Sequence, residues 1–363
     1  MGINRAGHLA LKTTTLPVLG NILLKTEKNY LTVTTTNLEA GIHHQIRGKV
    51  EEEGECLVPA KLILDLIPLL PEGNILIKKN NSGLIITANK IKTTLRTTPT
   101  TEFPIIPSIE NPSHKLIINT QQLEGALNKT IFAAGHADQK PQFNGLLLAI
   151  NDSNGKKISI VATDGYRLSE VVLTTNKEHA THKLIIPLAT AQELQRVLYQ
   201  QEAENIEIQA NDNQINFTVG PTQIISRLID GEYPDYQPLF PDKTLTECVV
   251  LKNDLARAIK AASLFSRAGI FDISLRASPG HPLEISAENA GVGSNSTSLE
   301  AETTGEEITV VINARYLLDG LGAMGGERVK ILLTGAERPI LLQSSNGVEK
   351  IDFRHLIVLI KQA

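Results

Sequence analysis

The residues best suited to chemistry in this chain are spelled TDGYRL, Thr163–Leu168. An Asp-Gly pair between two apolar runs, SIVA before it and LSEVVL after it, predicts the turn of a β-hairpin. A turn does not require large side chains after it, whereas this one is followed by Tyr166, Arg167 and Leu168. An aromatic ring, a guanidinium group and an aliphatic chain together favour a surface that binds an apolar anchor of a peptide.

No catalytic or metal-binding pattern of similar clarity occurs elsewhere. The nine His show neither HExxH nor another metal-ligand spacing. GVGSNS at Gly291–Ser296 lacks a complete GxGxxG and a Walker lysine, and it reads as a turn after a strand. Asp164 has Asn37 and Asn289 as its counterparts in two similar segments, and Asn cannot act as a general base. We therefore expect a turn residue there, no catalysis, no metal and no cofactor.

Composition limits the remaining classes of protein. The 363 residues predict two or three domains, and a hydrophobic content of 41% with 4% aromatics and no Trp predicts aliphatic cores. With 35 basic and 39 acidic residues, any surface for nucleic acid must be local. Cys56 and Cys248 give no disulfide framework, and no apolar run is long enough to span a membrane. These features favour the reducing cytoplasm.

The chain repeats a domain-sized unit. Three segments each read as strand, polar turn and strand, followed by an Asx residue at the next turn: Asn21–Ile42, Asn144–Val172 and Phe271–Ser296. The Asx residues are Asn37, Asp164 and Asn289, and they recur at a period of about 126 residues. A repeat of this length predicts tandem domains of one fold.

Further signals keep the same period. Three segments each read as a β-branched run, then Pro or Asn, then a helical pattern: Cys56–Leu66, Leu184–Leu194 and Val310–Leu321. The segments TEFP (Thr101–Pro104) and GEYP (Gly231–Pro234) both lead into Pro-rich stretches, which we interpret as linkers. The predicted domains are therefore 1–113, 114–243 and 244–363.

Within a unit the strand-then-helix pattern occurs twice. Lys115–Ala134 and Cys248–Phe265 are the first copies in units two and three, whereas unit one is expected to lack its first strand and most of its first helix. A truncated N-terminus and a misplaced start both fit this observation. Each unit is thus predicted to be a doubled β-α-β-β-β module, in an α+β fold with helices on one face of antiparallel sheets.

The predicted helices bury one apolar stripe and carry sparse cations on the other face. These cations are Lys61, Lys129, Arg196, Arg257, Lys260 and Arg315. One interpretation is an ordinary solvated helix face. The other is a shared basic wall, since the same kind of helix carries one or two cations in each repeat.

Four motifs together resemble the β sliding clamp of bacterial DNA polymerase III: TLPVLGNILL, VATDGYRLS, GEYPDY and INARYLLDGL. The likeness runs from about Leu16 to about Asp352, across all three units. It implies a head-to-tail homodimer that closes a six-domain ring, with helices inside, sheets outside and double-stranded DNA in the hole. It further implies a non-catalytic processivity subunit that binds the polymerase III α subunit, the clamp loader and other proteins with a clamp-binding motif.

The resemblance also implies a peptide pocket at the TDGYRL turn. By position its residues are Phe143, Thr163, Gly165, Tyr166, Arg167, Leu168, Pro234, Leu239, Pro339, Leu356 and Val358. For Arg167 the alternative is a structural role, with its head paired to an acid such as Glu170. Two features depart from the family: Tyr166 stands where His is usual, and the ending HLIVLIKQA has Leu359 where Pro is expected.

The ring interface of this family joins the first domain of one subunit to the third domain of the other. Its candidates here are Leu62, Ile63, Leu66, Leu264 and Phe265, although apolar residues in these segments fit a core equally well. Lys12 lies near the family's basic loop before TLP and joins the DNA-facing set.

Two other classes of protein are alternatives to this interpretation. A β-rich adhesion or carbohydrate-binding protein would be expected to carry a signal peptide and numerous exposed aromatics, and neither is seen. A hydrolase with an unrecognised site would show perturbed carboxylates in a cleft.

Overall fold

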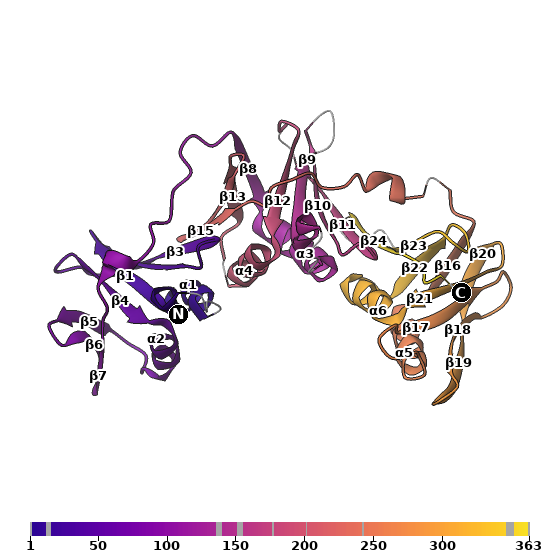
Figure 1. Ribbon diagram of the computed structural model, residues 1–363, viewed down its shortest axis with the longest axis horizontal. Coiled ribbons are helices and arrows are strands. Elements are labelled where there is room, and N and C mark those ends of the chain that lie inside the picture. Colours follow the sequence, from indigo (N-terminus) through magenta and orange to yellow (C-terminus); the bar gives the residue numbers. More distant parts are fainter. Residues whose placement is uncertain are drawn as a thin grey trace. The chain divides into compact units, whose positions relative to one another are not determined.

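The computed structural model describes residues 2–11, 16–135, 140–150, 155–175, 178–200, 202–241, 243–345 and 352–361. The helices among them are α1 (Gly2–Leu11), α2 (Ala60–Leu66), α3 (Thr120–Thr130), α4 (Leu188–Tyr199), α5 (Lys252–Ser263) and α6 (Ala314–Ala323), all shown in Figure 1. No helix in this described part is long and apolar enough to cross a membrane.

The first compact unit comprises residues up to 121 together with 192–228. It contains an eight-stranded antiparallel sheet in the order β4-β1-β2-β3-β15-β14-β13-β8. These strands are β1 (Asn21–Glu27), β2 (Tyr30–Thr36), β3 (Ala40–Arg47), β4 (Gly54–Pro59), β8 (His114–Asn119), β13 (Asn205–Ala210), β14 (Gln214–Val219) and β15 (Thr222–Arg227). A small sheet holds β5 (Ile75–Asn80), β6 (Gly83–Ala88) and β7 (Ile91–Leu95). Helix α1 packs on β2, β3 and α2.

The second unit comprises residues 122–191 and 229 onwards. Its nine-stranded sheet has the order β12-β9-β10-β11-β24-β23-β22-β16-β20, and its four-stranded sheet has the order β19-β18-β17-β21. The strands are β9 (Gly145–Ile150), β10 (Lys157–Thr163), β11 (Arg167–Thr174), β12 (His182–Pro187), β16 (Thr246–Leu251), β17 (Asp272–Ala277), β18 (Leu283–Asn289), β19 (Gly293–Leu299), β20 (Ala301–Gly305), β21 (Ile308–Asn313), β22 (Arg328–Leu333), β23 (Ile340–Ser344) and β24 (Asp352–Ile357). Helices α5 and α6 pack together, and α5 covers β16–β19 (Figure 1).

Two strand pairings join one sequence repeat to the next. Strand β3 of the first repeat pairs with β15 of the second, with Ile42 opposite Ile224. Strand β11 of the second repeat pairs with β24 of the third, with Ser169 opposite His355. The main-chain hydrogen bonds therefore run across the repeat boundaries, which is why three sequence repeats appear as two compact units.

The repeat is visible in the turn that each Asx residue makes. Asn37 Oδ1 accepts the N–H groups of Glu39 and Ala40, and Asn289 Oδ1 accepts that of Gly291. The Asp164 carboxylate makes the same kind of contact with the two residues that follow its own turn glycine. The prediction that these residues are turn formers is confirmed, since an Asx side chain satisfies the free N–H groups of a turn.

One expectation about the first repeat is wrong. Most of its first helix was expected to be absent, yet α1 is formed, with Ile3, Leu9 and Ala10 buried. A Cβ on Gly7 would lie 2.6 Å from Leu64 Cδ2, so this glycine permits the close approach of α1 to α2. A helix as short as Gly2–Leu11 is marginal in water by itself, and this packing stabilises it.

The helix predicted within the segment Cys56–Leu66 is formed. Helix α2 ends at Leu66, and a 3₁₀ turn follows at Ile67–Leu69. Pro68 cannot donate the N–H of a continuing α-helix. The cores are aliphatic as predicted, and Phe217 is the one aromatic among the largest fully buried side chains of the described residues.

Candidate functional site

The TDGYRL turn is held by its own side chains. Thr163 Oγ1 donates to the Arg167 carbonyl at 2.6 Å and accepts the Gly165 N–H at 3.0 Å. Gly165 has φ 91°, and a Cβ there would meet Phe143 Cε2 at 3.5 Å. A left-handed backbone favours glycine at this position. The turn therefore presents Tyr166, which is 64% exposed, on a fixed backbone.

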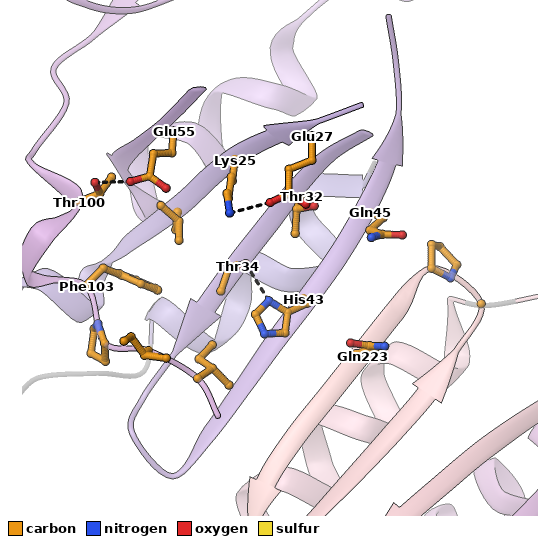
Figure 2. A pocket seen from close by; sticks show the side chains of 16 residues that line it. Lys25, Glu27, Thr32, Thr34, His43, Gln45, Glu55, Thr100, Phe103 and Gln223 are labelled. Carbon is orange, nitrogen blue, oxygen red and sulfur yellow. Dashed lines mark hydrogen bonds and ion pairs between the residues drawn. The ribbon is translucent and has the colours of Figure 1, made fainter. Parts of the chain in front are cut away.

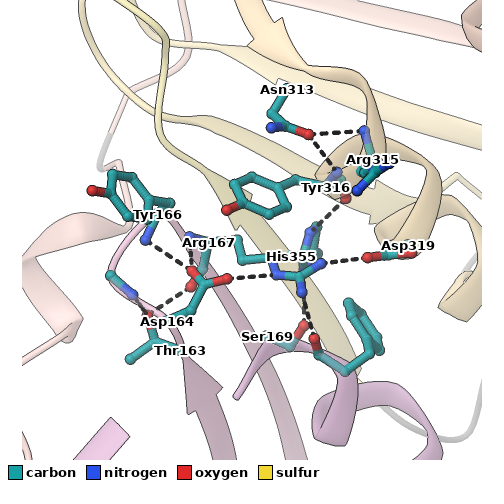
Figure 3. A network of polar contacts seen from close by, with 12 residues as sticks. Thr163, Asp164, Tyr166, Arg167, Ser169, Asn313, Arg315, Tyr316, Asp319 and His355 are labelled. Atoms are coloured by element: carbon teal, nitrogen blue, oxygen red, sulfur yellow. Dashed lines mark hydrogen bonds and ion pairs between the residues drawn. The ribbon is translucent and has the colours of Figure 1, made fainter. Parts of the chain in front are cut away.

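Arg167 points away from solvent, and its side chain is only 12% exposed. Its guanidinium bonds Asp164 (Nε–Oδ2 3.0 Å) and Asp319 of α6 (Nη1–Oδ2 2.5 Å). It also donates to the Phe132 carbonyl at 2.6 Å and lies over the Tyr316 ring at 4.5 Å (Figure 3). Arg167 thus fastens α6 to the hairpin. This agrees with the alternative of a structural role with its head paired to an acid, although the acids are Asp164 and Asp319 and not Glu170.

His355 completes this network from β24. It is fully buried, its Nε2 donates to the Tyr316 carbonyl at 3.2 Å, and its Nδ1 accepts the Ser169 hydroxyl at 2.8 Å (Figure 3). Burial, and then the charge of Arg167, lower the pKa of His355 to about 3. The imidazole is therefore neutral near pH 7 and acts as a fixed donor and acceptor.

Glu170 makes a second network on the other face of β11. Its carboxylate is 1% exposed, forms an ion pair with Arg354, and accepts the Tyr236 hydroxyl at 2.9 Å and the Gln237 amide at 3.3 Å. Phe240 lies under the Arg354 guanidinium, 3.9 Å from it. Burial, and then the Glu170 charge, raise the pKa of Tyr236 above its ordinary value. The segment Tyr236–Phe240 is therefore fastened to the sheet.

Several of the predicted peptide-site residues come together around the turn. Leu168 and Leu356 lie opposite each other in β11 and β24 and share a buried cluster with Tyr233. The Val358 N–H donates to the Tyr166 carbonyl at 2.8 Å, so the chain after β24 runs beside the turn. The Phe143 ring meets the Tyr233 ring edge-on at 6.2 Å. This gives an apolar floor beside an exposed aromatic rim.

The other predicted residues border this surface. Pro234 and Leu239 are exposed in the segment fastened by Glu170, and Leu239 is 48% exposed. Pro339 precedes β23, whose Ile340 pairs with Ile357. Sequence reasoning missed Tyr233 and Tyr236 as parts of the floor, although the motif GEYPDY contained them.

Profiles of three protein domains match the chain in order. They are described as the N-terminal, central and C-terminal domains of the DNA polymerase III beta subunit, and they match residues 3–107, 117–235 and 237–358. The chain belongs to the DNA polymerase III β subunit family.

Relatives from several bacteria agree with this membership. A beta sliding clamp of Pseudomonas aeruginosa is 30% identical over 92% of this chain and 90% of its own length. One from Synechocystis is 26% identical over 96% of this chain and 94% of its own length. The crystal structure of a DNA polymerase sliding clamp from Pseudomonas aeruginosa with ligand superposes with a TM-score of 0.92 at 28% identity, covering 99% and 96% of the two chains.

The predicted DNA-facing residues of this β subunit fall into two groups. Lys61, Arg257, Lys260 and Arg315 are exposed on their helices. Arg257 pairs with Asp254 one turn away, and Arg315 lies 3.4 Å from the Phe271 ring.

The second group is engaged inside its own unit. Lys129 donates to the Ala323 carbonyl at 2.8 Å and lies over the Phe353 ring. Arg196 pairs with Glu193 and donates to the Arg5 carbonyl of α1. These two cations therefore link helices to their neighbours. Lys12 lies outside the described residues.

The predicted interface residues also divide. Leu62 is 56% and Leu264 is 74% exposed, while Leu66 and Phe265 are half-buried. Ile63 is fully buried in its own domain, so its assignment to an interface is wrong. The run LILDL has apolar residues on both the inner and the outer face of its helix, so the sequence alone does not show which of them are exposed.

Two of the edge strands among the described residues, β19 and β7, are of the same kinds as the strands that join the repeats. Strand β19 ends the four-stranded sheet, and β7 ends the three-stranded sheet. In addition, the described residues place no group of three or more His, Cys, Asp or Glu where it would hold a metal ion.

Proposed function

We propose that this β subunit closes with a second copy into a ring around double-stranded DNA, slides along it, and tethers replication proteins. The observation that carries the proposal is the repeated joint between domains. Each joint within the chain pairs the third strand of one hairpin module with the last strand of a neighbouring domain: β3 with β15 and β11 with β24. The same two kinds of strand, β19 and β7, are left at open edges. A head-to-tail pairing of two copies satisfies both edges.

The register of this third joint follows from the other two. The hairpin β18–β19 of the third repeat corresponds to the hairpin β2–β3 of the first. Ser296 pairs with Ser286 in the one as His43 pairs with Thr34 in the other. The residue before each, Asn295 or Ile42, therefore has the same position in its strand. The turns before β7 and β15 each have two residues, and the first of the two has a positive φ. Counted from the end of its turn, Thr93 therefore has the position in β7 that Ile224 has in β15. Because Ile42 lies opposite Ile224, Asn295 should lie opposite Thr93 of the second copy.

Exposed apolar side chains support the same joint. Leu62 and Leu264 are among the most exposed leucines of the described residues. Burial of one such side chain contributes roughly 1.5–3 kcal/mol. We therefore retain Leu62, Leu66, Leu264 and Phe265 as interface residues and leave out Ile63.

Sliding on DNA requires attraction without base contacts. Phosphate contacts carry no sequence information, whereas base contacts would fix the protein at one site. A formal net charge of −4 leaves only local basic surface, for which Lys61, Arg257, Lys260 and Arg315 are the proposed contributors. Retention then depends on ring closure, and the subunit acts as a non-catalytic processivity factor in the cytoplasm.

The proposed peptide site lies on the turn and the strand end beside it. Leu168, Leu356 and Tyr233 supply an apolar floor, and Tyr166 and Val358 form its rim. An apolar surface of this kind binds Leu or Phe side chains that anchor a linear peptide. The polymerase III α subunit, the clamp loader and other proteins with a clamp-binding motif are the proposed ligands.

Retention on circular DNA tests the ring. After loading on nicked circular DNA, the protein should remain bound at raised salt and leave when the circle is cut. Release by salt alone, before cutting, would show ordinary electrostatic binding and would overturn the proposal.

A further inference from the structure

A hollow of about 490 Å³ lies on the eight-stranded sheet of the first unit (Figure 2). Its floor includes Leu23, Thr34 and His43, and Phe103 and Ile106 of the segment after β7 form one side. Volumes of this size accommodate small ligands or single side chains of a peptide. The peptide site proposed above involves none of these residues.

The second unit has the same framework, and the strand registers show which residues correspond. Leu23 lies opposite Thr34 in β1 and β2, as Leu147 lies opposite Val161 in β9 and β10. Leu147 is 1% exposed under its cover, whereas Leu23 is half-buried. The same floor is thus covered in one unit and open in the other.

An aromatic side chain of the chain itself provides this cover in the second unit. Tyr236 is 6% exposed in the buried apolar cluster that also contains Leu147, and its hydroxyl donates to Glu170. Glu170 lies opposite Val161, as His43 lies opposite Thr34 in the first unit. His43 therefore has the position in the first unit that Glu170, the acceptor of the Tyr236 hydroxyl, has in the second.

The first unit has a smaller residue where the tyrosine would stand. Counting from the Phe-Pro and Tyr-Pro pairs, Ile106 takes the position of Tyr236. A Cβ on Gly41 would lie 2.6 Å from Ile106 Cδ1, so Ile106 packs down on that glycine. It fills the space above Gly41 and leaves the floor at Leu23 open.

We propose that this hollow binds a tyrosine side chain presented by an extended segment of a partner protein. The ring would lie on Leu23 beside Phe103, and the hydroxyl would bond the His43 imidazole. The proposal extends beyond the proposed clamp function and does not depend on it.

The polar groups of the hollow suit a neutral hydroxyl. Lys25 is paired with Glu27 at 2.6 Å, and Glu55 accepts the Thr100 hydroxyl at 2.6 Å (Figure 2). His43 Nδ1 lies 2.9 Å from Thr34 Oγ1, and burial lowers its pKa, which favours the neutral ring. Because these charges have partners, an ionic ligand gains little, while a phenol can donate to or accept from imidazole.

Ile105, at the mouth of the hollow, is a further contact for the peptide segment that carries the tyrosine. Ile105 is 93% exposed, next to the two residues that wall the hollow. Its counterpart by position in the second unit is Asp235, a residue suited to solvent. An exposed isoleucine at the mouth of a half-apolar hollow favours a peptide over a free small molecule.

The probe for this proposal is N-acetyl-tyrosinamide, titrated into full-length protein and followed by NMR signals of His and of Leu and Ile methyl groups. Shifts should map to His43, Leu23 and Ile106. The hydroxyl contact should make it bind about fivefold more tightly than N-acetyl-phenylalaninamide, as expected for one neutral hydrogen bond. Equal binding of N-acetyl-leucinamide, or shifts confined to the Tyr166 turn, would overturn the proposal.

Two variants test the hydroxyl contact and the hollow separately. His43→Leu should reduce the tyrosine-to-phenylalanine ratio to about one, while the matched His281→Leu, at an exposed turn, should leave it unchanged. Ile106→Tyr should fill the hollow from within and abolish binding of both probes. Persistence of tyrosine binding in Ile106→Tyr, or an unchanged ratio in His43→Leu, would count against the site. If His43→Leu does not fold, the Ile106→Tyr result decides.

Discussion

A cysteine pair across the proposed ring joint tests its register directly. Thr93→Cys and Asn295→Cys in one chain should form disulfides between two copies. The expected geometry comes from the joint between β3 and β15. There the Gln45 N–H donates to the Pro221 carbonyl and the Arg227 N–H donates to the Glu39 carbonyl, so every second pair is hydrogen-bonded.

The pair at Ile42 and Ile224 is therefore a non-hydrogen-bonded pair, and Thr93 with Asn295 inherits this position. Such pairs have Cα atoms about 4.5 Å apart, inside the range of about 4.4–6.8 Å that a disulfide spans. The native Cys56 and Cys248 are 4% and 0% exposed, so they do not compete.

Mild oxidation followed by non-reducing electrophoresis reads the result. The product should run at twice the 39.5 kDa of one chain and should resist dilution. Thr93→Cys with Ser296→Cys is the matched control, because neighbouring residues of a strand point to opposite faces. Equal yields from the two pairs, or no product from a chain that is dimeric by light scattering, would refute the register.

Three further predictions concern the second unit. Tyr166→Ala should weaken binding of a polymerase-derived peptide about tenfold in fluorescence anisotropy, because it removes an exposed aromatic anchor; unchanged affinity would contradict the site. Arg167→Ala should lower the free energy of unfolding in urea by about 2–3 kcal/mol, since loss of the 12% exposed guanidinium leaves the 17% exposed Asp164 carboxylate and the Phe132 carbonyl without this donor, whereas Asp319→Asn, at a 46% exposed carboxylate, should cost under about 1 kcal/mol; equal losses would argue against this assignment. The folded-state pKa of His355, about 3, lies below its ordinary value of 6.5, so the unfolded chain binds the extra proton and stability is lost as pH falls from about 6.5 towards 3. By pH 5 this loss amounts to about 2 kcal/mol, and His355→Asn should flatten the dependence of Tm on pH; an unchanged slope would show that other groups carry it.

Local signals predicted the elements and turns well. The hairpin β10–β11, the turn role of Asp164 and the start of α6 after Asn313 follow from turn and cap chemistry that neighbouring residues decide. The repeat period then supplied the module, because each copy carries the same local signals.

The side-chain partners depended on residues far apart in sequence. Asp319 reaches Arg167 from 152 residues away, and no spacing rule announces that pair. For the same reason Lys129 was placed on an exposed helix face although its ammonium bonds the Ala323 carbonyl. Ile63 and Leu62 are adjacent in an apolar run, and only tertiary packing decides which of them is buried.

The strand pairings across the repeat boundaries have a consequence for cutting the chain. A protease that cleaves the segment 104–113 severs the peptide link between the first two repeats, but β3 and β15 still hold them through their main-chain hydrogen bonds. The nicked fragments should comigrate until a denaturant separates them. The middle repeat accordingly cannot be excised intact, because its removal leaves two bare strand edges that invite aggregation.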